Sequence, residues 1–166
     1  MEGLTSIGGD LDISRSDALT SLSGLDNLTS IGGSLIIGAL DYLGCEGNSS
    51  LTSLAGLHNL ISIGGDLIVI CNDSLTSLTG LEKIDAGTIT GITISHNSVL
   101  STCEIQSICE YLLAPNGEIS IGLNAAGCNS IEEVDSICKF AHIEQNEAIT
   151  DQFTFYPNPV VSGATL

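Results

Sequence analysis

Six cysteines are the residues of this sequence with the most distinctive chemistry, because cysteines can bind a metal ion or form disulfides. They are Cys45, Cys71, Cys103, Cys109, Cys128 and Cys138. Zinc ribbons and related zinc sites contain cysteines that are two residues apart, and no pair in this sequence has that spacing. The three histidines are scattered and belong to no cysteine cluster. We therefore expect disulfides and an oxidising, extracellular environment.

The other reactive residue types form no arrangement that is typical of an enzyme. Glu132 and Glu133 are adjacent, so their side chains point in different directions and make a poor catalytic pair. His96 lies at an expected turn, where an exposed or hydrogen-bonded role is favoured over that of a base. The sequence contains neither a phosphate-binding glycine loop before a helix nor an Asp-x-Asp-x-Asp-Gly calcium loop. We predict a non-enzymatic protein with no catalytic residues, cofactor or metal ion.

Two repeated polar patterns each have two interpretations. Asp10 and Asp66 precede equivalent expected strands, with Ser34 between them, and they either hold a cation between repeats or cap a turn. We favour the capping role. A threonine that occurs once in each repeat resembles the ladder of ice-binding proteins, although one threonine per repeat is a weak pattern and scaffold is the preferred interpretation; these residues are Thr20, Thr52 and Thr76.

The charge balance restricts the possible partners. The 166 residues include 20 acidic residues and three basic ones, which gives a net charge of −17. Such a surface repels phosphate backbones, so we expect no nucleic-acid binding, and we interpret it as a solvated exterior rather than a cation site. No apolar run approaches the about 20 residues of a transmembrane helix, so no membrane insertion is expected. Met1-Glu2-Gly3 does not resemble the start of a signal peptide.

A repeat of about 24 residues sets the positions of all these side chains. The segment Leu4-Thr-Ser-Ile-Gly-Gly-Asp-Leu-Asp-Ile13 recurs with small changes from Leu28 and from Leu60. Leu4 and Leu28 are 24 positions apart, whereas Leu28 and Leu60 are 32 apart. We place the excess in a loop over residues 38–50, because Gly, Asn and Ser are abundant there. A second block, Leu-Thr-Ser-Leu-x-Gly-Leu, begins at Leu19, Leu51 and Leu75.

Each repeat is predicted to add one strand to a parallel sheet. The Leu-x-Ile step has the period of two that places both side chains on one face of a strand. Five such steps are expected to stack: Leu11/Ile13, Leu35/Ile37, Leu67/Val69, Ile92/Ile94 and Ile119/Ile121. Polar residues three positions later are expected to satisfy backbone groups of the turn; they are Ser16, Asn72, Asn97 and Asn124. The glycine pairs at 8–9, 32–33 and 64–65 are expected to supply positive φ angles at the opposite turn.

The last repeats differ from the first ones. Residues 98–113 and 129–141 carry apolar side chains at helical spacing, which predicts a short helix in each. The predicted fold class is therefore mostly β, a right-handed parallel β-solenoid with short helices in its C-terminal repeats. Such a repeat buries its leucines only by stacking on its neighbours.

The repeat resembles the leucine-rich repeat, with two differences in spacing. Gly-Gly-Asp places three residues before the strand where the usual repeat has one, and the Asn-x-x-Leu spacing is one residue longer than usual. Both differences are similar to the receptor L domain of growth-factor and insulin receptor ectodomains. The resemblance covers residues 4–138 and implies a right-handed solenoid used for recognition or adhesion.

The register of the repeats selects one of the fifteen possible cysteine pairings. Cys109 and Cys138 each follow Ser-Ile at equivalent places in successive repeats. Cys103 and Cys128 also belong to successive repeats, and Cys45 lies in the long loop one repeat before Cys71. We predict the disulfides Cys45–Cys71, Cys103–Cys128 and Cys109–Cys138, each worth about 2–4 kcal/mol.

The tail carries a second resemblance. Phe153-Thr-Phe-Tyr-Pro-Asn-Pro-Val160, followed by Ser162-Gly163, is similar to the opening of the C-terminal sorting domain of the type IX secretion system. This resemblance implies a protein exported by a Bacteroidetes-type bacterium. The expected organisation is a solenoid over residues 1–141, a linker over 142–152 and the start of a sorting domain over 153–166.

Two functional classes fit these expectations. The first is a recognition or adhesion module that is secreted or displayed on the outer cell surface and binds a protein or glycan ligand. The second is a structural subunit that self-associates end to end, because the first repeat begins at Leu4 without a capping segment and would expose strand edges.

Overall fold

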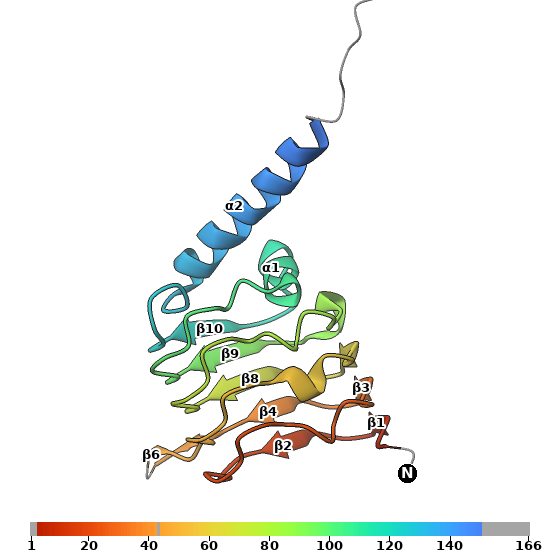
Figure 1. The fold of residues 1–166 in the computed structure, drawn as a ribbon, viewed down its shortest axis with the longest axis vertical. Coiled ribbons are helices and arrows are strands. Elements are labelled where there is room, and N and C mark those ends of the chain that lie inside the picture. The colour runs from red at the N-terminus through yellow and green to blue at the C-terminus, as the bar shows by residue number, and fades with distance from the viewer. Residues whose placement is uncertain (1–2, 43, 151–166) are drawn as a thin grey trace, which may run out of the picture.

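The computed structural model describes residues 3–42 and 44–150 of the chain. Its main element is a five-stranded sheet, called here the long sheet, in which every neighbouring pair is parallel. The strand order β10-β9-β8-β4-β2 follows the chain from one end of the molecule to the other, as Figure 1 shows. The strands are β2 (Leu11–Ile13), β4 (Leu35–Ile37), β8 (Leu67–Ile70), β9 (Ile92–Ser95) and β10 (Ile119–Gly122).

The register of the long sheet confirms the five predicted strand steps. Leu35 pairs with Leu11 on one side and with Leu67 on the other, and Val69 pairs with Ile94. Equivalent residues of the repeat therefore lie side by side. A second, short sheet has the parallel order β1-β3-β7, and its strands are β1 (Ser6–Ile7), β3 (Ser30–Ile31) and β7 (Ser62–Ile63). The architecture is thus one of parallel sheets with two helices, which is consistent with the expected stacking of repeats.

The core between these elements consists almost entirely of leucine and isoleucine. Leu35, Leu54 and Leu67 are completely buried, whereas Leu11, the equivalent of Leu35 in the first repeat, is only partly buried. Tyr111 is the one completely buried aromatic side chain among the described residues. Its hydroxyl group donates to the Thr90 carbonyl and accepts from the Gly117 amide, so burial leaves it satisfied.

A ladder of buried asparagines lines one turn of the repeat, as predicted, but with one additional member. The backbone amide of Asn72 donates to Oδ1 of Asn97, and the Asn72 side chain donates to the carbonyls of Ile37 and Ile70. Asn48 has the same role one repeat earlier, since its side chain bonds Asn72 and the Ile13 carbonyl. The predicted loop over residues 38–50 includes Asn48, and this part of the prediction is wrong. The insertion ends at Gly47, after which Asn48 resumes the repeat.

The glycine pairs do not have the predicted positive φ angles. Positive φ angles occur at other glycines, such as Gly24 and Gly80, and at the residue before several ladder asparagines, such as His96 with φ 57°. The glycine pairs instead allow close approach of consecutive repeats. A Cβ atom on Gly32 would lie 2.5 Å from the carbonyl oxygen of Gly8, and one on Gly65 would lie 2.7 Å from the amide nitrogen of Ser34. The close backbone contact therefore requires glycine at positions 32 and 65.

The inserted segment forms a small hairpin rather than an open loop. Its strands β5 (Leu40–Asp41) and β6 (Gly44–Cys45) pair antiparallel. The hairpin ends are held by reciprocal hydrogen bonds between Ala39 and Glu46. Short 3-10 turns, η1 (Ala55–Leu57) and η2 (Ala86–Thr88), lie in later repeats.

Both helices differ in extent from the prediction. Helix α1 (Gln106–Leu113) is shorter than residues 98–113, because Leu100 and Cys103 are buried like repeat leucines and Thr102 forms a parallel bridge with Ser77. Helix α2 (Ile131–Thr150) is longer than expected and runs through 142–150, where a linker was predicted. This segment contains two Glu, one Gln and one Ala, which are good helix formers, and it contains no Gly or Pro to end the helix. Residues 153–166, the expected sorting-domain start, lie outside the described residues.

Candidate functional site

The structure contains the three disulfides that the register of the repeats predicts. They join Cys45 to Cys71, Cys103 to Cys128 and Cys109 to Cys138, with Cα–Cα distances of 5.4, 5.6 and 5.5 Å. Cys103 and Cys128 are completely buried, and their disulfide links consecutive repeats through the core. Cys45 is exposed, and its disulfide fastens the hairpin to the next repeat. Three disulfides fit an extracellular protein.

Two further features of the described residues concern metal binding and membrane insertion. Within residues 3–42 and 44–150, no group of three or more His, Cys, Asp or Glu side chains is placed to hold a metal ion. In the same residues, no helix combines the length and hydropathy needed to cross a bilayer.

Asp10 and Asp66 have the capping contacts that we favoured. Oδ1 of Asp10 accepts a hydrogen bond from the backbone amide of Ser34 at 2.7 Å. The Ser34 hydroxyl accepts from the amide of Asp66 at 3.0 Å, and Asp66 accepts from the Thr90 hydroxyl in turn. These residues therefore form a polar chain that crosses the repeats just before the long sheet.

The remaining singled-out residues are engaged in local hydrogen bonds. Nδ1 of His96 lies 3.2 Å from the Ser95 hydroxyl, at a turn with no acidic partner in the described hydrogen bonds. Glu133 accepts from the amides of Gly127 and Asn129 before helix α2, whereas Glu132 is exposed. The pKa of Glu132 is lowered, chiefly by its own backbone amide and then by the Ser130 hydroxyl. Thr52 donates its hydroxyl to the Thr20 carbonyl, as expected of a scaffold residue.

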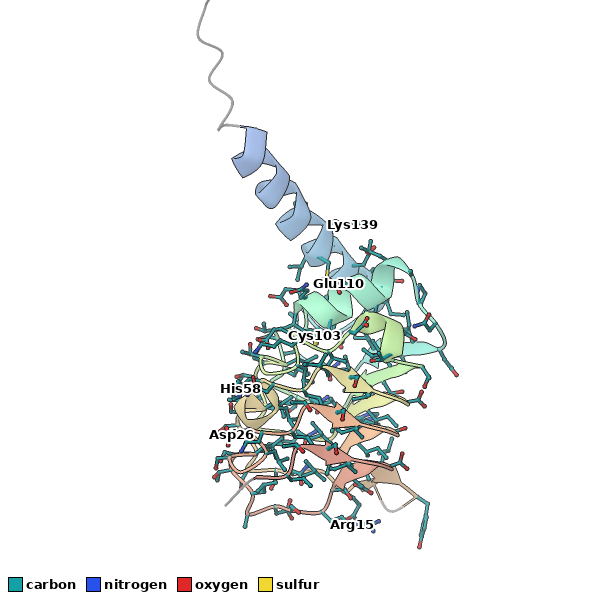
Figure 2. The ribbon with its side chains drawn as sticks, turned by 90° about the vertical axis from the view of Figure 1, so that its right-hand side faces the viewer. Arg15, Asp26, His58, Cys103, Glu110 and Lys139 are labelled. Carbon is teal, nitrogen blue, oxygen red and sulfur yellow. A yellow bond between two sulfur atoms is a disulfide. The ribbon has the colours of Figure 1, made fainter. Side chains whose placement is uncertain are left out.

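Asp26 and His58 lie on the turn side of the molecule, next to each other in consecutive repeats (Figure 2). Oδ2 of Asp26 accepts a hydrogen bond from the Gly24 amide at 2.9 Å. This hydrogen bond is the main reason why the pKa of Asp26 is lowered, partial desolvation opposes it, and the positive charge of His58 adds a smaller lowering. Asn59 connects the two repeats, since its side chain donates to the Asp26 carbonyl and accepts from Lys83.

The outer face of the long sheet is the largest feature that the sequence analysis did not single out. Because side chains alternate along a strand, the residues between the buried ones point away from the core. Strand register places five of them in one line, called here the outer row: Asp12, Ile36, Ile68, Thr93 and Ser120. The two isoleucines of this row are only partly buried, and so is Ile70 beside them.

The hairpin presents further apolar surface. Tyr42 is 94% exposed and Leu40 is 49% exposed. Apolar residues at outward positions were visible in the sequence, as Ile36 inside Leu35-Ile-Ile37 and Ile68 inside Leu67-Ile-Val69. A strand with one solvent-exposed face normally carries polar residues on that face. An isoleucine at an outward position was therefore the sequence signal that could have identified this surface.

A polar pocket adjoins the outer row where strands β8, β9 and β10 begin. It has a volume of about 360 Å³ and is lined mainly by Asp66, Thr90, Gly91, Thr93, Glu118 and Ser120. Gly91 lies between the two acidic residues, and a Cβ atom there would be 3.0 Å from Oδ1 of Asp66 and 3.4 Å from the Glu118 carbonyl oxygen. The absent side chain of Gly91 therefore leaves space between the Asp66 carboxylate and the Glu118 backbone.

A second, larger groove follows the short sheet. Its volume is about 520 Å³, and its lining includes Ser6, Ser30, Ser62 and Thr88 with the glycines that follow β1, β3 and β7. These hydroxyls and glycines carry no charge. The outer face of the long sheet, with its isoleucines, hairpin and acidic pocket, is therefore the more specific candidate site.

Comparison of the chain with family models, with curated proteins and with solved structures finds no match in any of the three.

Proposed function

We propose that this chain is a non-enzymatic recognition or adhesion module that binds its partner with the outer face of the long sheet and the adjoining hairpin. The observation that carries the proposal is the outer row, in which Ile36 and Ile68 are partly exposed between polar neighbours. Apolar side chains surrounded by polar ones on a rigid sheet are typical of a protein-binding surface. Tyr42, exposed in the hairpin that follows β4, is of the residue type that often contributes most to binding.

The fold that we propose for this module is a right-handed solenoid similar to the receptor L domain and the leucine-rich repeat. The parallel register of both sheets and the return of the chain after 24 to 27 residues, with one step of 32, support this interpretation. Each repeat then adds one row position to a continuous surface. An experimental structure that shows antiparallel pairing between Ile36 and Ile68 would contradict it.

We further propose an extracellular or outer-surface location, reached through type IX secretion. Three disulfides and the −17 net charge support an exported, soluble domain, and the Tyr156-Pro-Asn-Pro159 motif supports the route. Replacement of this motif by four alanines in the protein expressed in its natural host should leave the protein inside the cell. Unchanged export of that variant would remove the sorting interpretation.

Site-directed photocrosslinking tests the proposed recognition surface. A photoreactive amino acid is placed singly at Ile68, at Tyr42 or at the control position Thr52, which is exposed in the turn opposite the long sheet. Each purified variant is incubated with the outer surface and the secreted fraction of the source cells. A discrete adduct from positions 68 and 42, and none from position 52, is the expected result. No adduct from any position, or equal adducts from all three, would contradict the proposed surface.

The alternative function is an end-to-end structural subunit that self-associates through its first repeat. The favouring observation is that β1 and β2 are the end strands of their sheets and that Leu4 is 51% exposed. Light scattering of the purified chain decides between the two, because filaments would give species far above the 17.1 kDa monomer. Monomers at all concentrations would exclude assembly, whereas concentration-dependent fibres that Leu11→Asp abolishes would establish it.

A further inference from the structure

The pocket at Gly91 has a chemistry that identifies the kind of side chain it accepts. The carboxylate of Asp66 and the backbone carbonyl oxygen of Glu118 lie next to the space that a side chain at position 91 would occupy, and both acidic residues line the pocket. The hydroxyls of Thr93 and Ser120 complete the lining on the side of the outer row. Among the described residues that line the pocket, none is a lysine or arginine. Carboxylates and hydroxyls together match a group with several hydrogen-bond donors and a positive charge.

The two acidic residues have different internal roles. Asp66 is held in position because it accepts from the Thr90 hydroxyl, so its carboxylate is already oriented before a partner arrives. The Glu118 carbonyl is used within the sheet, where it accepts from the Ile92 amide at 2.9 Å. The hydrogen bonds of the described residues do not use the Glu118 carboxylate, which leaves that group available to a partner.

The surroundings of the pocket add an apolar contact. Thr93, which lines the pocket, pairs in register with Ile68, and Ile68 pairs with Ile36. A lysine or arginine has an apolar stem of three or four methylene groups below its charged end. With the charged end between Asp66 and Glu118, such a stem would lie over Thr93, and neighbouring apolar residues of the same partner would cover Ile68 and Ile36.

The charge of the whole chain favours the same partner. The described lysines and arginine lie away from the pocket: Arg15 pairs with Glu46, Lys139 with Asp135, and Lys83 donates to Asn59. Figure 2 shows Arg15 and Lys139 near opposite ends of the stack of repeats. A net charge of −17 attracts cationic proteins over a long range, and the pocket then provides a specific contact for one of their side chains.

We propose that the outer face of the long sheet binds a cationic, amphipathic protein segment, with a lysine or arginine inserted between Asp66 and Glu118 and apolar side chains on Ile36 and Ile68. This inference deepens the proposed recognition function and depends on it for the choice of surface. In this proposal, Gly91 keeps the pocket open for the side chain of the partner.

A defined peptide provides the direct test. The probe is a 14-residue amphipathic peptide of lysines and leucines, and its matched control is the same peptide with every lysine acetylated, which removes the charge but keeps the stem. Calorimetry or fluorescence anisotropy measures binding to the intact chain. The lysine peptide is expected to bind and the acetylated peptide to bind at least about tenfold more weakly. Equal binding of both peptides would overturn the proposal.

Matched variants separate the pocket from the general negative charge. Asp66→Asn and Glu118→Gln should each weaken binding of the lysine peptide by about fivefold, which is typical of a partly exposed ion pair. Asp10→Asn is the control, because Asp10 precedes the equivalent strand two repeats earlier and loses the same charge outside the pocket. Its expected effect is less than about twofold. The same loss in all three variants would show that only net charge matters, and would overturn the pocket.

A steric variant completes the test without any change in charge. Gly91→Gln fills the space beside the Asp66 carboxylate in the pocket, and its Cβ atom meets first the movable end of the Asp66 side chain rather than backbone. Binding should fall about as much as in Asp66→Asn. Gly8→Gln is the control, since no atom lies within 4 Å of a Cβ at that position. Thermal unfolding of each variant verifies that the fold is retained, and full binding by folded Gly91→Gln would overturn the inference.

The two proposals fail in different ways. If photocrosslinking at Ile68 finds a natural partner whose affinity is unchanged by Asp66→Asn and by Gly91→Gln, then the recognition surface stands and the cationic contact is wrong. If the lysine peptide binds through the pocket but no natural adduct forms at positions 68 and 42, then the pocket chemistry stands and the recognition function is wrong.

Discussion

The end strands of the long sheet are alike in that Leu11 and Ile13 of β2 and Ile119 and Ile121 of β10 are only partly buried, but the rest of the first repeat and of the C-terminal end differ. Leu11, Ile13 and Leu19 of the first repeat are only partly buried, whereas their equivalents in the next repeat are completely buried. At the other end, Cys103, Cys128 and Val134 are also completely buried, and two disulfides and both helices are gathered there. The difference teaches that the stabilisation from a repeat residue depends on the repeats beside it rather than on its own motif.

The asparagine ladder should give the largest difference in stabilisation between an interior repeat and the first repeat. Asn72→Ala leaves the Ile37 and Ile70 carbonyls and the Asn48 amide without their buried partner. We expect a loss of about 4 kcal/mol in the free energy of unfolding, because each unsatisfied buried group costs about 1–3 kcal/mol before relaxation. Urea denaturation followed by circular dichroism measures it.

The matched change in the first repeat is Ser16→Ala, at the equivalent position. Ser16 is only partly buried, and its backbone amide, which bonds Asn48, remains in the variant. The expected loss is below about 1 kcal/mol. Equal losses for the two variants would show that the ladder contributes the same at the end as in the interior.

The disulfides compare the C-terminal end with the hairpin. They close chain segments of almost the same length, with separations of 25 for Cys103–Cys128 and 26 for Cys45–Cys71, so the entropic contribution of each is about 3 kcal/mol. Replacement of Cys103 and Cys128 by alanine should cost about 1 kcal/mol more than replacement of the other pair, because it also leaves a cavity in the core.

The thiol chemistry should follow the same order. Cys45 is exposed, so a mild reductant should open the hairpin disulfide first, and the two C-terminal disulfides should persist. Alkylation with mass-spectrometric mapping at increasing reductant concentration measures the order. Earlier loss of Cys103–Cys128 would mean that the C-terminal end is the more mobile one.

The glycine pairs give a smaller effect but a more direct test of stacking. Gly64→Ala places a Cβ atom against the backbone carbonyl of Gly32, and we expect a loss of about 2 kcal/mol. Gly8→Ala, at the same place in the first repeat, meets no atom within 4 Å and should be neutral or slightly stabilising. If Gly8→Ala is as destabilising as Gly64→Ala, the glycines are required by backbone conformation and not by close approach. Thermal unfolding of the two variants decides this.

Much of the fold could be predicted because each repeat adds the same elements in the same register. The period of two in Leu-x-Ile located all five strands of the long sheet, and the register led to the disulfide pairs that the structure contains. Asn48 was missed because an insertion separates it from its strand, and the count of three residues fails across an insertion. The start of helix α1 was misplaced because Leu100 and Cys103 satisfy a helical period and a repeat position equally well.

Most of the candidate site could not be predicted from the sequence. Asp66 and Glu118 are 52 positions apart and line one pocket because the strands that follow them, β8 and β10, both pair with β9. Gly91 matters because it has no side chain, and a search for motifs of charged or polar residues does not find such a position. The glycine pairs were located correctly, but their purpose was misassigned, since sequence does not distinguish a positive φ angle from a close backbone approach.

The smallest predicted effect concerns an interaction that lies within one repeat. The pKa of Asp26 is lowered mainly by the Gly24 amide, two residues away, so this shift should not depend on the stacking of repeats. A lowered folded-state pKa stabilises the protein above the unfolded value, near 3.8, and this contribution is lost as the pH falls through the folded value. Carboxyl NMR should therefore find Asp26 titrating below an aspartate in the unfolded chain, and Asp26→Asn should reduce the loss of stability on acidification.

The informative control is the same titration in Asn72→Ala, which weakens contacts between repeats and leaves the Gly24–Asp26 turn intact. We expect the Asp26 pKa to stay low in that variant and to rise slightly in His58→Gln, since the charge of His58 is the smaller, inter-repeat cause. A return of the Asp26 pKa to the unfolded value in Asn72→Ala would show that even this local turn is imposed by the neighbouring repeat. The first repeat would then depend on its neighbour for its turns as well as for its core.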